Sequence, residues 1–106
     1  MAWMFLLAAG LLEIVWSFTM KLSQGFTRGM PTAVTVLVML ASFALLSISM
    51  RTLPLGTAYT VWTGIGGVGA FVVGVVVLGE PLTIARVLAA ALIVAGLAIM
   101  KLTTSA

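Results

Sequence analysis

Four long apolar stretches, separated by short polar segments, are the feature that most constrains this chain. Of its 106 residues, 63% are hydrophobic and 7% are charged, whereas a soluble domain carries about 25% charged residues. A membrane-spanning helix needs roughly 20 apolar residues, so the length accommodates four spans and little else. We expect the spans at about residues 2–20, 31–50, 56–78 and 84–100. The sequence therefore predicts an all-α membrane protein in which one four-helix transmembrane domain takes up residues 1–106.

The connections between these spans are short, so consecutive helices are expected to be antiparallel neighbours. Pro31 suits the start of the second span, because its missing N–H would have no helical partner there. Cys, His and Asp are absent, so we expect no transition-metal site. Neither a nucleophile–base pair nor a phosphate-binding loop is visible, and we expect neither an enzyme nor a bound cofactor. The scattered basic residues do not predict nucleic-acid binding.

The basic residues are divided almost equally between the two ends of the bundle. Arg51 and Lys101 lie at one end, and Lys21, Arg28 and Arg86 at the other. Basic residues in short loops decide which way a chain inserts, and two against three is a weak bias. The sequence alone leaves open a single orientation and a dual topology, in which chains insert both ways.

Glu13 lies in the middle of the first expected span, which has no other charge. A carboxylate at membrane depth costs several kcal/mol unless it is paired, hydrated or protonated, and such residues usually mark a functional site. The only other carboxylate, Glu80, precedes Pro81 at an expected loop. Any cation or proton chemistry inside the membrane therefore depends on Glu13.

Residues three and four apart share one face of a helix, which places Ala9, Gly10, Trp16 and Ser17 on the face of Glu13. Ala9 and Gly10 leave space over the carboxylate, and the indole of Trp16 offers a face that attracts cations. The small residues could instead form a helix-packing seam, and Trp16 could be an interfacial anchor. We favour a site role for Trp16.

Ser42 lies at the same depth in the second span as Glu13 does in the first. A hydroxyl in a membrane helix commonly bonds a carbonyl of its own helix. Ser42 could instead donate to the Glu13 carboxylate, and the sequence does not separate the two possibilities.

The third span combines an aromatic face with a run of glycines. Tyr59, Trp62 and Gly66 share one face, which could complete a box for a flat cation; packing in the core is the alternative. The glycines of the run permit either close helix packing or a flexible hinge of the kind a transporter needs. The hinge candidates are Gly64, Gly66, Gly67 and Gly69.

The fourth span has neither a charge nor an aromatic residue in its middle. Ala89 and Gly96 lie about seven residues apart on one stripe of small residues, which suits a helix–helix seam. We expect this span to serve dimerisation.

Together these features match a known pattern. It consists of Glu13 in the first span, Lys21-Leu22-Ser23 and Gly25-Phe26-Thr27-Arg28 before Pro31, Gly56-Thr57-Ala58-Tyr59-Thr60-Val61-Trp62 with Gly64 and Gly66, and Glu80-Pro81. The whole chain resembles the small multidrug resistance family of proton-coupled exporters. The residues that resemble its guanidinium exporter subtype are Gly10, Trp16, Met39, Ser42 and Lys101. Ser17 is a departure, since a small apolar residue is common there.

The resemblance implies an antiparallel, dual-topology homodimer in the inner (plasma) membrane of a prokaryote. Two copies in opposite orientations would supply the inverted repeat that one short chain lacks. Its two Glu13 carboxylates would bind guanidinium or small guanidinyl compounds and exchange them for protons. On this hypothesis Ser42 and Trp62 orient the carboxylates by hydrogen bonds, and Tyr59 and Trp16 form the walls.

Three other functions remain as alternatives. The first is a multidrug exporter of quaternary ammonium or polyaromatic cations with the same fold. The second, a proton-carrying rotor subunit of an ATP synthase, is disfavoured, because such subunits are two-helix hairpins with the acid in the last helix. The third is a passive channel or a structural membrane subunit.

Overall fold

A computed structural model describes residues 1–104, and within that part the regular structure is entirely helical. The helices are α1 (Ala2–Leu22), α2 (Gly29–Ser49), α3 (Leu55–Val76) and α4 (Ile84–Thr103). Each of the four is long and apolar enough to cross a membrane. This matches the predicted helical class and number of spans.

The helix ends differ from the expected spans by a few residues. Helix α2 begins at Gly29 rather than Pro31, because a proline is tolerated anywhere in the first turn, where N–H groups have no helical acceptor. Helix α3 ends at Val76, ahead of a turn in which Gly79 has a φ of 70°. Helix α4 continues past the expected end to Thr103.

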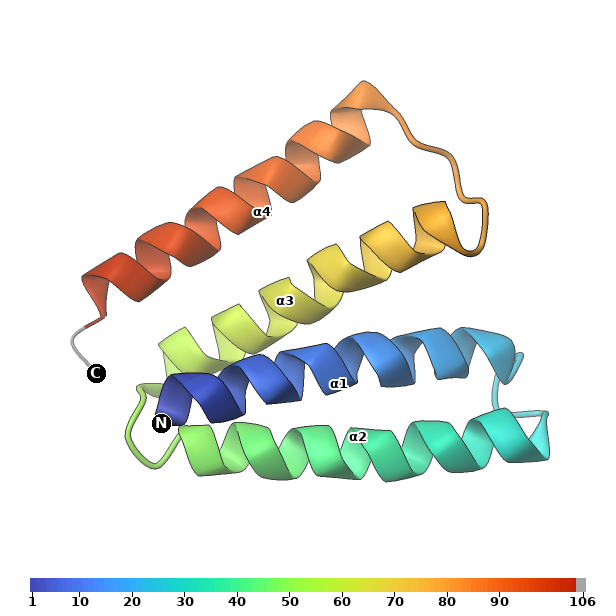
Figure 1. The fold of residues 1–106 in the computed structure, drawn as a ribbon, viewed down its shortest axis with the longest axis horizontal. Coiled ribbons are helices and arrows are strands. Elements are labelled where there is room, and N and C mark those ends of the chain that lie inside the picture. Colours follow the sequence, from blue (N-terminus) through green and yellow to red (C-terminus); the bar gives the residue numbers. More distant parts are fainter. Residues whose placement is uncertain (105–106) are drawn as a thin grey trace.

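Helix α1 lies between α2 and α3, and these three helices form the packed part of the molecule (Figure 1). The buried core includes Leu6, Ala9, Leu46, Ala58 and Trp62. A hydrogen bond of 2.6 Å between the hydroxyls of Thr19 and Thr35 also joins α1 to α2. Because α1 packs against both α2 and α3, its position determines where Glu13 lies along these two helices.

The backbone of α4 packs against that of α3 and stands apart from those of α1 and α2 (Figure 1), although the Lys101 side chain of α4 reaches the Trp3 ring of α1. None of its residues is buried. At its C-terminal end, the hydroxyls of Thr57 and Thr104 lie 3.3 Å apart. The predicted seam residues Ala89 and Gly96 are both exposed, and a methyl group added to Gly96 would have no atom within 4 Å. One face of α4 is therefore open to a further helix.

Candidate functional site

The Glu13 side chain extends from α1 to the backbone of α3 at Gly66. A Cβ atom placed on Gly66 would overlap the Glu13 carboxyl group, since it would lie 2.6 Å from Glu13 Cγ and closer still to the carboxylate. The Glu13 Oε1 atom is buried and has no hydrogen-bond partner within residues 1–104. The absence of a side chain at Gly66 is thus what makes room for the carboxylate.

Ser42 and Trp62 do not hydrogen-bond Glu13 within this chain, so the hydrogen bonds expected from them to its carboxylate are absent here. The Ser42 hydroxyl donates to the carbonyl oxygen of Ala9 at 2.7 Å, and the Trp62 indole N–H donates to Ser42 Oγ at 3.0 Å. A serine hydroxyl has one proton, and here it goes to a backbone carbonyl of α1. Ser42 therefore links α2 to α1 and fixes the Trp62 ring, which lies one helical turn before Gly66 on α3.

Replacing Ser42 with alanine is expected to destabilise the fold by about 1–3 kcal/mol. The substitution leaves the buried Trp62 indole N–H without its acceptor, which carries a desolvation penalty, and it removes the bond from Ser42 to the Ala9 carbonyl that joins α2 to α1. Thermal unfolding of the purified variant in detergent measures the loss. Replacing Ser47, whose side chain is exposed, is the matched control. Equal stability of the Ser42→Ala variant and the wild type would contradict these hydrogen-bond assignments.

Four aromatic rings follow one another across the faces of α1, α2 and α3. Trp16 and Phe43 have ring centroids 6.4 Å apart, Phe43 and Trp62 5.7 Å, and Trp62 and Tyr59 5.4 Å. The indole N–H of Trp16 is buried without a partner in the described residues. Trp16, Trp62 and Tyr59 are thus parts of one continuous aromatic wall.

Phe43 is the member of this wall that the sequence analysis missed. It stands between the rings of Trp16 and Trp62 and meets each of them edge-on or nearly so. A signal was available, because Phe43 is the only aromatic residue of α2 and directly follows Ser42.

Gly10 and Ser17, the other polar or small residues near Glu13, have local partners. A Cβ atom on Gly10 would lie 2.6 Å from Ile65 Cγ2, so Gly10 lets α3 approach α1 closely. The Ser17 hydroxyl donates to the carbonyl of Ile14 at 2.8 Å within its own helix. Within one chain, Gly10 therefore allows close helix packing. The Ser17 hydroxyl has already donated its proton and can only accept a further hydrogen bond.

Most of the predicted hinge glycines lie against side chains of neighbouring helices. A Cβ atom on Gly64 would lie 2.6 Å from Leu97 of α4, and one on Gly69 would overlap Ile14 of α1. Gly66 faces Glu13, and only Gly67 has open space around it. Helix α3 runs unbroken through all four. These contacts support the close-packing role, and Gly67 remains the position with freedom to bend.

Few charged residues lie within the helices of the bundle. No group of three or more His, Cys, Asp or Glu side chains occurs among residues 1–104. Near the other end of α1, the Lys101 ammonium lies 4.9 Å from the centroid of the Trp3 ring. The candidate site thus combines the Glu13 carboxylate, the bare helix surface at Gly66 and the aromatic wall, an arrangement suited to a flat organic cation.

Comparison with known proteins adds a family. The sequence model described as Small Multidrug Resistance protein matches residues 1–93. A protein named Guanidinium exporter from Citrobacter freundii is 54% identical over 104 residues, which cover 98% of this chain and 99% of that protein. Proteins of the same name from Salmonella typhi and Yersinia pseudotuberculosis are 52% and 50% identical over 102 residues, each covering 96% of this chain and 97% or 98% of their own length.

Proposed function

This chain belongs to the small multidrug resistance family, and we propose that it exports guanidinium and small guanidinyl compounds in exchange for protons. Because its relatives are exporters, it is a multi-pass membrane transporter and not an enzyme. The bacterial origin of those relatives supports a place in the inner (plasma) membrane of a prokaryote.

The observation that carries the proposal is the Glu13 carboxylate on the Gly66 surface, beside the aromatic wall. Guanidinium is planar and permanently charged, and its paired N–H groups match a carboxylate bidentately. A helix position without a side chain, with aromatic rings one turn away on α1 and on α3, suits the thin profile of such an ion. The names of the full-length relatives support the same substrate.

Exchange follows from competition for one group. Glu13 holds a proton or a guanidinium ion, but not both, so each displaces the other. If the protein changes the side to which the site opens only when Glu13 is occupied, an inward proton gradient drives guanidinium outward. No other residue has to change its charge.

We propose an antiparallel homodimer as the working unit, with two Glu13 carboxylates at one site. Two observations support it: the exposed face of α4 with its small residues, and the near balance of basic residues between the ends of the bundle. In such a dimer, the hydrogen-bonded pair of Ser42 and Trp62 in each chain would brace the wall of the shared site.

The test is transport in vesicles reconstituted from the purified protein. An imposed proton gradient should drive guanidinium against its own gradient, which excludes a passive channel and a structural subunit. A quaternary ammonium dye, the substrate of the alternative multidrug function, should be transported poorly under the same gradient. Transport of the dye in preference to guanidinium would favour the alternative, and transport of neither would refute both.

Replacing Trp16 with glycine is expected to loosen selectivity toward bulkier cations. The substitution removes the ring that meets Phe43 and enlarges the space on the Glu13 face of α1. Rates for guanidinium and for a series of alkylated guanidinium ions in the vesicle assay measure the change. An unchanged substrate profile would indicate that Trp16 serves packing only. The matched control is Trp3→Gly, at the end of the same helix.

A further inference from the structure

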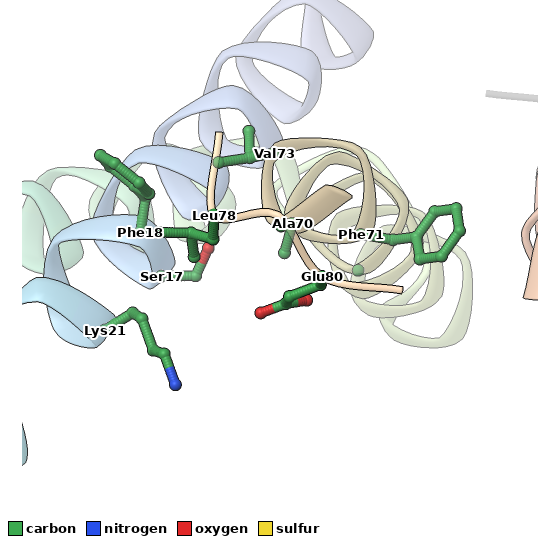
Figure 2. A pocket seen from close by; sticks show the side chains of 10 residues that line it. Ser17, Phe18, Lys21, Ala70, Phe71, Val73, Leu78 and Glu80 are labelled. Carbon is green, nitrogen blue, oxygen red and sulfur yellow. The ribbon is translucent and has the colours of Figure 1, made fainter. Parts of the chain in front are cut away.

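A second carboxylate, Glu80, faces a cavity that the proposed site does not use. The cavity has a volume of about 310 Å³ and lies between the C-terminal halves of α1 and α3, beside the segment that follows α3. Ser17 and Lys21 line it from α1, and Gly67 and Gly74 line it from α3. Figure 2 shows the Glu80 carboxylate directed into the space that Ser17 and Lys21 border from the other side.

The backbone holds Glu80 in this position. Gly79 has a φ of 70°, which reverses the chain after α3, and the Glu80 N–H then donates to the Gly74 carbonyl at 2.9 Å. The carboxylate folds onto Gly74, where a Cβ atom would overlap its Oε1 and lie 2.8 Å from its Cδ. Gly74 is buried. A turn and a bare stretch of helix thus hold the exposed side chain against α3, at the border of the cavity.

The inner wall of the cavity lies close to Glu13. Ser17 follows Glu13 by four residues, roughly 6 Å along the axis of α1, and on the same face. Gly67, on the facing helix, directly follows Gly66, the residue that Glu13 touches. A cation at the inner wall of this cavity would therefore be about one helical turn from the site, whereas Glu80, which lies on Gly74, is about 12 Å from Gly66 along α3.

We propose that Glu80 is a capture site for guanidinium-type cations, from which they pass to Glu13. This inference rests on the proposed export function and concerns how the substrate reaches the site. The Glu80 carboxylate offers the bidentate acceptor that guanidinium prefers, in a cavity between the C-terminal halves of α1 and α3. Lys21 lines the same cavity, and its ammonium group repels the substrate and competes with it for Glu80.

The two side chains should therefore act in opposite directions. In the vesicle assay, Glu80→Gln is expected to raise the KM for guanidinium about twofold to fivefold, the range expected of an exposed ion pair, with an unchanged maximal rate. Lys21→Gln is expected to lower the KM about twofold. Both effects should shrink at high salt, because exposed charges are screened. Glu80→Asp, which keeps the carboxylate, should restore the KM.

Arg28→Gln is the matched control, because Arg28 is exposed, lies near the same end of the bundle and does not line the cavity. It removes the same charge as Lys21→Gln and so has the same effect on insertion; its KM should equal that of the wild type. An unchanged KM in Glu80→Gln, or shifts of the same sign in the Glu80 and Lys21 variants, would overturn the inference. Loss of transport in both Glu80→Gln and Glu80→Asp would also overturn it, since it would indicate a structural requirement. Wild-type protein that fails to transport guanidinium would instead refute the proposed function.

Discussion

Replacing Glu13 with glutamine is expected to abolish guanidinium binding and proton exchange, with a loss of at least about 100-fold in transport rate. The amide has nearly the size of the carboxylate but carries no charge, so it neither balances guanidinium nor takes up a proton. Removing one partner of a buried charge pair costs about 2–5 kcal/mol, and each 1.4 kcal/mol is tenfold in affinity. Proton-driven guanidinium uptake into vesicles measures the effect.

Glu13→Asp is the control for this substitution, because it keeps a carboxylate at the same position and should retain measurable exchange. Size-exclusion chromatography in detergent shows whether the glutamine variant keeps its assembly. Glu13 Oε1 has no hydrogen-bond partner in residues 1–104, so the change breaks no intramolecular bond of that atom. Proton-coupled guanidinium transport that survived in Glu13→Gln would contradict the proposed mechanism.

Replacing Gly66 with alanine is expected to weaken guanidinium binding by about tenfold or more. The new methyl group would occupy the space of the Glu13 carboxylate, so either the side chain turns away or α1 and α3 separate. A shift of about 1 Å in a positioned group can cost up to 100-fold in rate, and overpacking costs about 1–3 kcal/mol of stability. Isothermal titration of the purified protein with guanidinium measures the affinity.

The control for Gly66→Ala is Gly56→Ala in the same helix, since a methyl group there would have no atom within 4 Å. This variant should bind guanidinium as the wild type does. If Gly66→Ala bound guanidinium with unchanged affinity, the position of the carboxylate against Gly66 would not matter to the site. A thermal unfolding curve for each variant separates a displaced carboxylate from a disrupted bundle.

The spans and the membrane class were predictable, because both depend on local composition. A run of about 20 apolar residues predicts a membrane helix wherever its neighbours lie. The helix ends were less predictable. Helix α3 stops at Val76 because of a turn around Gly79 and the bond from Glu80 N–H to Gly74, which depend on backbone geometry rather than on hydropathy.

Part of the candidate site was also predictable from helical periodicity. The shared face of Trp62 and Gly66 followed from their spacing, and in the structure Gly66 meets Glu13. The partner of Ser42 was not predictable. Its hydroxyl reaches the Ala9 carbonyl through the rotation and depth of α2 against α1, which no spacing within one helix defines.

The glycines illustrate the same limit. A glycine in a membrane helix is equally consistent with close packing and with bending, and only the neighbouring helix distinguishes them. Gly64 and Gly69 have side chains of α4 and α1 against them, whereas Gly67 has none. The open face of α4 is a further case. In the proposed dimer this face packs against a second copy of the chain, and the sequence of one chain does not define where that copy lies.

The most direct test of competition at Glu13 is the release of protons when guanidinium binds. Purified protein in weakly buffered detergent solution is titrated with guanidinium chloride while a pH indicator reports protons. Guanidinium is expected to release protons from the wild-type protein in proportion to the sites filled, and none from Glu13→Gln. Guanidinium binding to the wild type without proton release, or equal release from both proteins, would contradict it.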